Sequence, residues 1–155
     1  MIKEPRIVIK KYLRRLELFD GERLVKVYTI VLGSAPDKDK EIEGDGRTPD
    51  GNFYVFTKNS RSKFHLSLGL SYPNIPAAER GLAAGIINRE EYDSIVRAIK
   101  DGKMPPQKTR LGGEIYIHGG GVESDWTEGC IALNDSEIEE LYAAVPVGCP
   151  VTISM

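Results

Sequence analysis

Apolar and polar residues alternate through much of the first half of the chain, and this alternation predicts β-strands. Side chains on a strand point to opposite faces in turn, so a period of two residues is typical of strands with one buried face. Asp20-Gly21 lies between two such segments and is a typical two-residue hairpin signal. The first third therefore reads as a meander of strands. Strands are predicted over residues 6–10, 13–19, 24–32, 53–57 and 64–70.

A helical period replaces the alternation in the middle of the chain. Asn88 is a favourable N-cap, and Glu91 three residues later is typical of a capping box. Apolar residues then follow at helical spacing until Gly102 ends the segment. The residues of this stripe are Tyr92, Ile95, Val96 and Ile99.

A second helix is predicted near the C-terminus. Asn134 and Glu137 suggest another capping box, and Pro146 closes the helix. The predicted buried stripe is Ile138, Leu141, Tyr142 and Val145. Short strands are predicted over residues 115–118 and 151–153.

These elements favour a mainly β fold with inserted helices, in the α+β class. Strands and helices do not alternate regularly, so a βαβ array is disfavoured. The length of 155 residues is typical of one domain, and we expect a single domain over residues 1–155.

Composition narrows the classes of function. Lys and Arg number 21 against 23 Asp and Glu, a formal net charge of −2, which argues against a nucleic-acid binder and a polybasic membrane-surface protein. The longest apolar runs, residues 28–32 and 82–87, are far shorter than the roughly 20 residues of a membrane span. The N-terminal residues carry no secretory signal pattern.

Cysteine and histidine are scarce. The two cysteines, Cys130 and Cys149, form no CxxC pattern, and the two histidines, His65 and His118, form no HxH or HExxH pattern. We therefore expect neither a metal nor another cofactor.

One segment carries the elements of nucleophilic catalysis. His118 ends a predicted strand and enters three glycines, and Cys130 follows Gly129 twelve residues later. A thiol has a pKa of about 8.5, and a nearby imidazole or imidazolium lowers it, provided that the ring reaches hydrogen-bond distance of the sulfur. Main-chain N–H groups near Gly129 and Cys130 are candidates to hold an oxyanion. The carbonyl of Gly119 is a candidate to accept the second imidazole N–H and fix the tautomer.

Structural interpretations compete with these functional ones. A free cysteine is more often a small buried apolar residue, and Cys149 is interpreted as packing at a turn. His65 lies within a predicted strand, either as a satisfied side chain or as part of the substrate groove. Trp126 is interpreted either as core or as the wall of a cleft. Nearby acidic residues are interpreted as a solvated loop: Glu123, Asp125 and Glu128.

The same segment resembles the catalytic motif of the L,D-transpeptidase (YkuD-like) family. The resemblance is carried by His118-Gly119-Gly120 followed by residues 125–133. Residues 48–53 resemble the family's TPxGxF segment, residues 111–118 its GGDIxIHG segment, and residues 64–74 a strand in the middle of its domain. Together these segments extend over nearly the whole chain.

The resemblance implies a β-sandwich or barrel-like domain with a helix packed after the cysteine. It implies Cys130 as nucleophile, His118 as the essential imidazole and Gly119 as the group that orients it. Residues implied in substrate binding are Gly129, Gly120, Tyr72, Trp126 and His65.

The implied substrates are peptidoglycan stem peptides, used for crosslinking or protein attachment in cell-wall biogenesis and cell shape, with carbapenem-type inhibitors as further ligands. The implied place of action is the periplasm or cell envelope, and we expect a monomer. The chain departs from the common family pattern, which has a His where Glu128 stands and an Arg where Ala132 stands. A carboxypeptidase or amidase, and a non-catalytic wall-binding module, remain open as alternatives.

Overall fold

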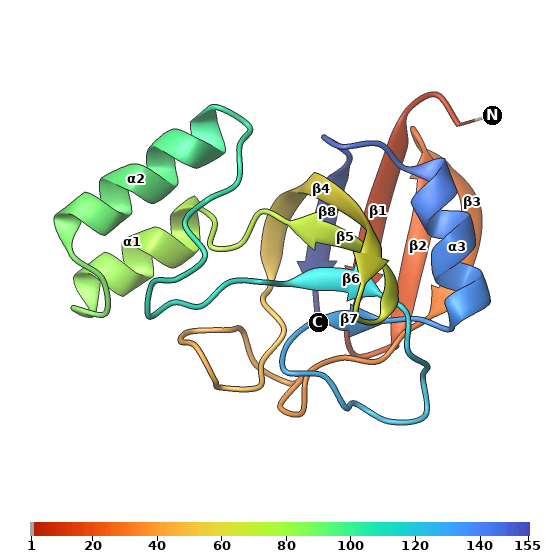
Figure 1. The fold of residues 1–155 in the computed structure, drawn as a ribbon, viewed down its shortest axis with the longest axis horizontal. Coiled ribbons are helices and arrows are strands. Elements are labelled where there is room, and N and C mark those ends of the chain that lie inside the picture. The colour runs from red at the N-terminus through yellow and green to blue at the C-terminus, as the bar shows by residue number, and fades with distance from the viewer. Residues whose placement is uncertain (1) are drawn as a thin grey trace.

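The computed structural model describes residues 2–155, and its strands form one strongly curled sheet (Figure 1). Within these residues the sheet has eight strands in the order β3-β2-β1-β8-β4-β5-β6-β7. The strands are β1 (Pro5–Lys10), β2 (Arg15–Asp20), β3 (Arg23–Thr29), β4 (Gly51–Ser62), β5 (His65–Leu70), β6 (Tyr116–His118), β7 (Ile131–Ala132) and β8 (Pro150–Ser154).

The pairing directions combine a three-stranded meander and a hairpin with two parallel contacts. β1, β2 and β3 form the expected antiparallel meander, and β4 and β5 form a long antiparallel hairpin. β8 lies between β1, to which it is parallel, and β4, to which it is antiparallel. β6 pairs antiparallel with β5 and parallel with β7. The predicted mainly β fold with inserted helices is confirmed.

The two ends of the sheet meet at β7. Val31, just after β3, exchanges two main-chain hydrogen bonds with Ala132 of β7, both 3.0 Å long. A second bridge joins Gly33 to Thr127. These contacts give the sheet its barrel-like form, and the closing seam lies directly beside Cys130.

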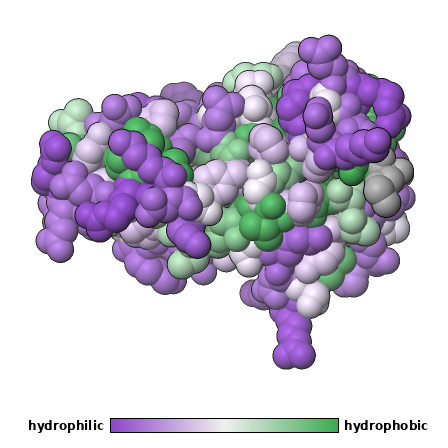
Figure 2. Space-filling model, turned by 90° about the horizontal axis from the view of Figure 1, so that it is seen from above, coloured by the Kyte–Doolittle hydropathy of each residue, from purple (hydrophilic) through white to green (hydrophobic). Residues whose placement is uncertain are grey.

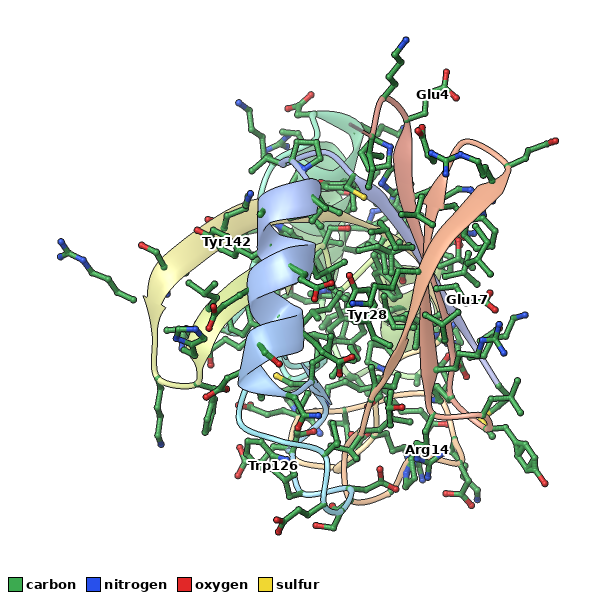
Figure 3. All side chains as sticks on the ribbon, turned by 90° about the vertical axis from the view of Figure 1, so that its right-hand side faces the viewer. Glu4, Arg14, Glu17, Tyr28, Trp126 and Tyr142 are labelled. Atoms are coloured by element: carbon green, nitrogen blue, oxygen red, sulfur yellow. The ribbon has the colours of Figure 1, made fainter. Side chains whose placement is uncertain are left out.

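The helices lie on two sides of the sheet (Figure 1). α1 (Ile75–Ala83) and α2 (Arg89–Lys100) pack against each other beyond the β4–β5 side and enclose a small apolar cluster of their own. α3 (Asp135–Ala144) follows the cysteine segment and packs on β5 and β6. Figure 3 shows Tyr28 pointing between the sheet and α3.

The capping predictions have different outcomes. The α2 box is confirmed, because the Asn88 side chain accepts from the Glu91 N–H and the Glu91 carboxylate accepts from the Asn88 N–H. The predicted box at α3 is wrong, since the Asn134 side chain makes no capping hydrogen bond. Helix α1, which the sequence did not predict, begins at Asn74, whose side chain accepts from the Ala77 N–H at 3.1 Å.

Apolar side chains from all three β1–β3 strands, β8, β4–β6 and α3 form the main core. Figure 2 shows polar residues over most of one face of the surface, with apolar residues in small groups. None of the helices within residues 2–155 is long and apolar enough to cross a membrane.

A fully buried lysine ties the long loop after β3 to the sheet. The ammonium of Lys11, at the end of β1, donates to the carbonyls of Thr48 at 2.7 Å and Lys38 at 3.1 Å. It also lies 3.1 Å from the Asp50 carboxylate. These contacts fix the loop of residues 33–50 against the barrel, and this loop supplies one wall of the candidate active site.

Candidate active site

The structure places His118 and Cys130 on neighbouring parallel strands. His118 is the last residue of β6 and pairs with Ala132 of β7, while Cys130 immediately precedes β7. The chain between them is a loop of glycines and polar residues that returns to the same end of the sheet. Strand pairing thus places these two residues, twelve positions apart in sequence, at the same end of neighbouring strands.

The thiol of Cys130 is held by main-chain groups of the segment that enters β6. Its sulfur accepts from the Tyr116 N–H at 3.3 Å and donates to the Glu114 carbonyl at 3.3 Å. Burial of the sulfur raises the pKa of Cys130 to about 11, against the lowering effect of the Tyr116 N–H. Glu114 and Glu128 raise this pKa further and Lys40 lowers it. The sequence led us to expect a thiol pKa below 8.5; this expectation is corrected, because burial of the sulfur raises the pKa and favours the protonated thiol in the resting site.

His118 is 3% exposed, and its tautomer is fixed by its neighbour in the chain. Nδ1 lies 2.5 Å from the Gly119 carbonyl, and a carbonyl only accepts, so Nδ1 carries the proton. Burial lowers the pKa of His118, against the raising effect of this hydrogen bond. The ring is therefore neutral at neutral pH, with a free lone pair on Nε2.

Two aromatic rings cover the imidazole. Phe64 stacks on His118 with ring centroids 4.6 Å apart and an angle of 24° between the planes. Trp126 lies 5.6 Å from the imidazole and 5.1 Å from Phe64, and its Nε1 donates to the Gly121 carbonyl at 3.0 Å. Figure 3 shows Trp126 on the loop below α3, and its side chain is 37% exposed. Trp126 thus forms part of the wall around the imidazole rather than of the core.

The glycine before the cysteine serves close packing, and the N–H of the cysteine itself stays free within the described part of the chain. Gly129 has φ +137°, and a Cβ there would lie 2.8 Å from the Arg47 carbonyl, so a side chain would not fit without strain. The Gly129 N–H already donates to Thr127 Oγ1 at 3.2 Å. The Cys130 N–H makes no hydrogen bond within residues 2–155, so it is the donor left for an oxyanion.

The N–H of Gly120, two residues after His118, is also occupied. It donates to the Asp135 carboxylate at 3.0 Å, at the start of α3. A Cβ at this position would lie 2.8 Å from the Trp126 ring. Gly120 therefore shapes the site through its small size.

Two residues implied in substrate binding lie away from the cysteine. Tyr72 is buried in the core, and its hydroxyl donates to the Leu111 carbonyl at 2.8 Å. His65 is exposed at the start of β5, and its Nε2 lies 2.8 Å from the Glu139 carboxylate on α3. Both side chains have partners of their own, and neither lines the cavity at Cys130.

Cys130 opens into a cavity of about 450 Å³ between the 33–50 loop and the segment before β6. Sequence reasoning missed most of its charged lining, because these residues stand in polar segments that resemble ordinary loops. The charged residues that line it are Lys40, Glu43, Lys108, Glu114 and Glu128.

We expect the alkylation of Cys130 by iodoacetamide to rise with a midpoint near pH 11, because desolvation of the half-buried thiol delays its ionisation. The measurement is the alkylation rate as a function of pH in the Cys149→Ser variant, in which Cys130 is the remaining thiol. A midpoint below pH 8.5 would show instead that the resting site holds a thiolate.

A family model described as the L,D-transpeptidase catalytic domain (YkuD) matches residues 4–153 of the chain. A search of curated protein sequences gave no match.

Several solved structures share the fold. The helical cell shape determining protein Pgp2 from Campylobacter jejuni matches with a TM-score of 0.65 and 21% identity, over 97% of this chain and 47% of that chain. Bd1075 from Bdellovibrio bacteriovorus matches with a TM-score of 0.63 and 18% identity, over 99% and 48%. The L,D-transpeptidase LdtMt1, solved in complex with imipenem, matches with a TM-score of 0.55 and 12% identity, over 97% and 58%. The chain thus spans about half the length of the first two.

Proposed function

The chain belongs to the L,D-transpeptidase catalytic domain (YkuD) family, and on this basis we propose that it is a cysteine acyltransferase acting on peptidoglycan stem peptides in the cell envelope. One observation carries the proposal. The thiol of Cys130 opens into a cavity, and the pairing of β6 with β7 puts His118, whose tautomer leaves a lone pair on Nε2, on the neighbouring strand. A nucleophile, a neutral base and a free main-chain donor are the groups that acyl transfer through a thioester requires.

The reaction begins with the Cys130 thiol protonated and the His118 imidazole neutral. When substrate binds, His118 Nε2 takes the thiol proton, and the sulfur attacks the carbonyl of a diamino acid residue whose neighbour is D-Ala. A C–S bond forms, and the Cys130 N–H donates to the oxyanion. The C–N bond then breaks, the imidazolium protonates the departing amine, and a thioester remains. A second amine attacks the thioester, loses a proton to His118 and releases the thiol.

Incubation with purified muropeptides, followed by mass spectrometry, tests the proposal. Crosslinked dimers are expected from transfer to a second amine. Trimmed monomers or released peptide alone would instead favour the carboxypeptidase or amidase, in which water attacks the same thioester. Absence of all these products would contradict both.

A non-catalytic wall-binding module is the second candidate. It is favoured by the acidic Glu128 beside the cysteine and by the raised pKa of the thiol, since both oppose thiolate formation. A thiol-reactive probe applied with muropeptides present discriminates the two. In a binding module Cys130 reacts no faster than Cys149 and gains no acyl group, whereas in an enzyme intact-protein mass spectrometry shows the acyl group of the muropeptide on Cys130.

We expect a carbapenem such as imipenem to acylate Cys130. The strained β-lactam carbonyl is a good acyl donor to a thiol that has a base and an oxyanion donor beside it. Intact-protein mass spectrometry should show one adduct that is absent from the Cys130→Ala variant. An unmodified protein after prolonged incubation at high drug excess would count against the assignment.

A further inference from the structure

The ammonium of Lys40 lies in the wall of the Cys130 cavity and is only 3% exposed. It donates to the Ile42 carbonyl at 3.2 Å and to the Asp45 carboxylate at 3.0 Å. An ammonium has three N–H donors, and the third has no acceptor within residues 2–155. A buried cation with a free donor is costly unless a further acceptor reaches it.

The Asp45 carboxylate is already stabilised by main-chain groups. It accepts from the N–H groups of Glu41 at 2.9 Å, Ile42 at 3.1 Å and Arg47 at 3.1 Å. Burial opposes its ionisation, but these donors together with Lys40 hold the pKa of Asp45 below its usual value. The negative charge is shared among four donors, so part of the Lys40 charge remains available to the cavity. The field of Lys40 reaches the thiol, since it lowers the pKa of Cys130.

The rest of the cavity wall disfavours anions. Three carboxylates line it, those of Glu43, Glu114 and Glu128. The other cation, Lys108, has a side chain that is 85% exposed, with Nζ 3.9 Å from Glu114. An anionic group that enters this cavity is therefore directed to Lys40.

We propose that Lys40 binds a carboxylate of the substrate beside the bond that Cys130 attacks. The inference rests on the proposed function and deepens it, because the C-terminal residue of a stem peptide carries its carboxylate next to the scissile bond. Lys40 is then a specificity-determining residue that selects peptides with a free C-terminal carboxylate over peptides with a neutral end.

Calorimetric binding in the Cys130→Ala variant tests this without turnover. The probes are a tetrapeptide stem ending in D-Ala with a free carboxylate and the same peptide ending in a carboxamide. We expect the free carboxylate to bind about tenfold tighter, the range of one hydrogen bond to a charged group. In the Lys40→Met variant of the same protein the two peptides should bind equally, and in Lys40→Arg the preference should return.

The comparison of two peptides in one variant separates recognition from loop damage. A loosened loop weakens both peptides together and leaves their ratio unchanged. The Lys108→Met variant is the matched control, and its ratio should stay at about ten. A preference that persists in Lys40→Met, equal binding in the parent, or no binding of either peptide overturns the inference. The proposed function fails separately, when muropeptides give no product with the active protein.

Discussion

Replacement of Cys130 by Ala is expected to abolish turnover of muropeptides, with a loss of at least about 10³-fold, while the fold stays intact. The thiol supplies the atom that becomes acylated, and its cavity holds no other cysteine. Its hydrogen bonds to Glu114 and Tyr116 contribute little to the fold, because thiols are weak donors and acceptors. The measurement is product formation by mass spectrometry, with circular dichroism to verify folding.

The matched control is Cys149→Ser. Cys149 is 2% exposed at the turn before β8, and its sulfur contacts main-chain carbonyls of Pro5 and Pro150. Burial alone raises the pKa of this thiol to about 11, and no imidazole lies beside it within the described chain. Activity should persist in Cys149→Ser. An active Cys130→Ala protein, free of contaminating parent, would refute the nucleophile assignment.

Loss of the imidazole in His118→Ala is expected to lower the rate of acyl transfer by about 10²–10⁴-fold, the usual contribution of a general base. Because the resting thiol is protonated, the reaction depends on His118 to take its proton. Burial lowers the pKa of His118, so the neutral base persists below pH 6.5. In the parent, kcat/KM should fall only as the pH drops through this lowered value, and that acid limb should be absent from His118→Ala.

His65→Ala is the control for removal of a histidine. His65 is exposed, its Nε2 is paired with the Glu139 carboxylate of α3, and it does not line the cavity at Cys130, so its loss should change neither the rate nor the acid limb. Iodoacetamide alkylation of Cys130 in both variants adds a second readout. If His65→Ala shifts the alkylation profile and His118→Ala does not, the base has been misassigned.

The sequence predicted the elements whose signals are local. Alternation placed the meander of β1–β3, and the Asn88 box placed the start of α2. Helix α1 was missed because Pro76 and Gly81 weaken the helical signal, although Pro is acceptable in the first turn and Gly81 lets the helix approach Leu111. Strand β7 has two residues, too few to show a period, and exists because β6 and Val31 pair with it.

The candidate site was predictable only as far as its motif extends. The motif located Cys130 and His118, but the charged lining of the cavity is set by long-range packing. Nothing local distinguishes Lys40 from Lys38, two positions earlier, yet one ammonium is buried in the cavity wall. The thiol pKa was likewise unpredictable, since it depends on burial and on carboxylates from the segments that surround the sulfur.

The closing seam at β7 indicates when, during folding, the surroundings of Cys130 form. Ala132 pairs with His118 of β6 on one side and, on the other, with Val31, which stands about a hundred positions earlier in the chain. Contacts between distant segments require the closure of large loops, which delays them during folding. We infer that the surroundings of Cys130 are completed late, after the meander and the β4–β5 hairpin have formed. In the unfolded chain the thiol is therefore exposed to solvent. It becomes enclosed by protein only when β7 pairs with both of its neighbours and closes the sheet.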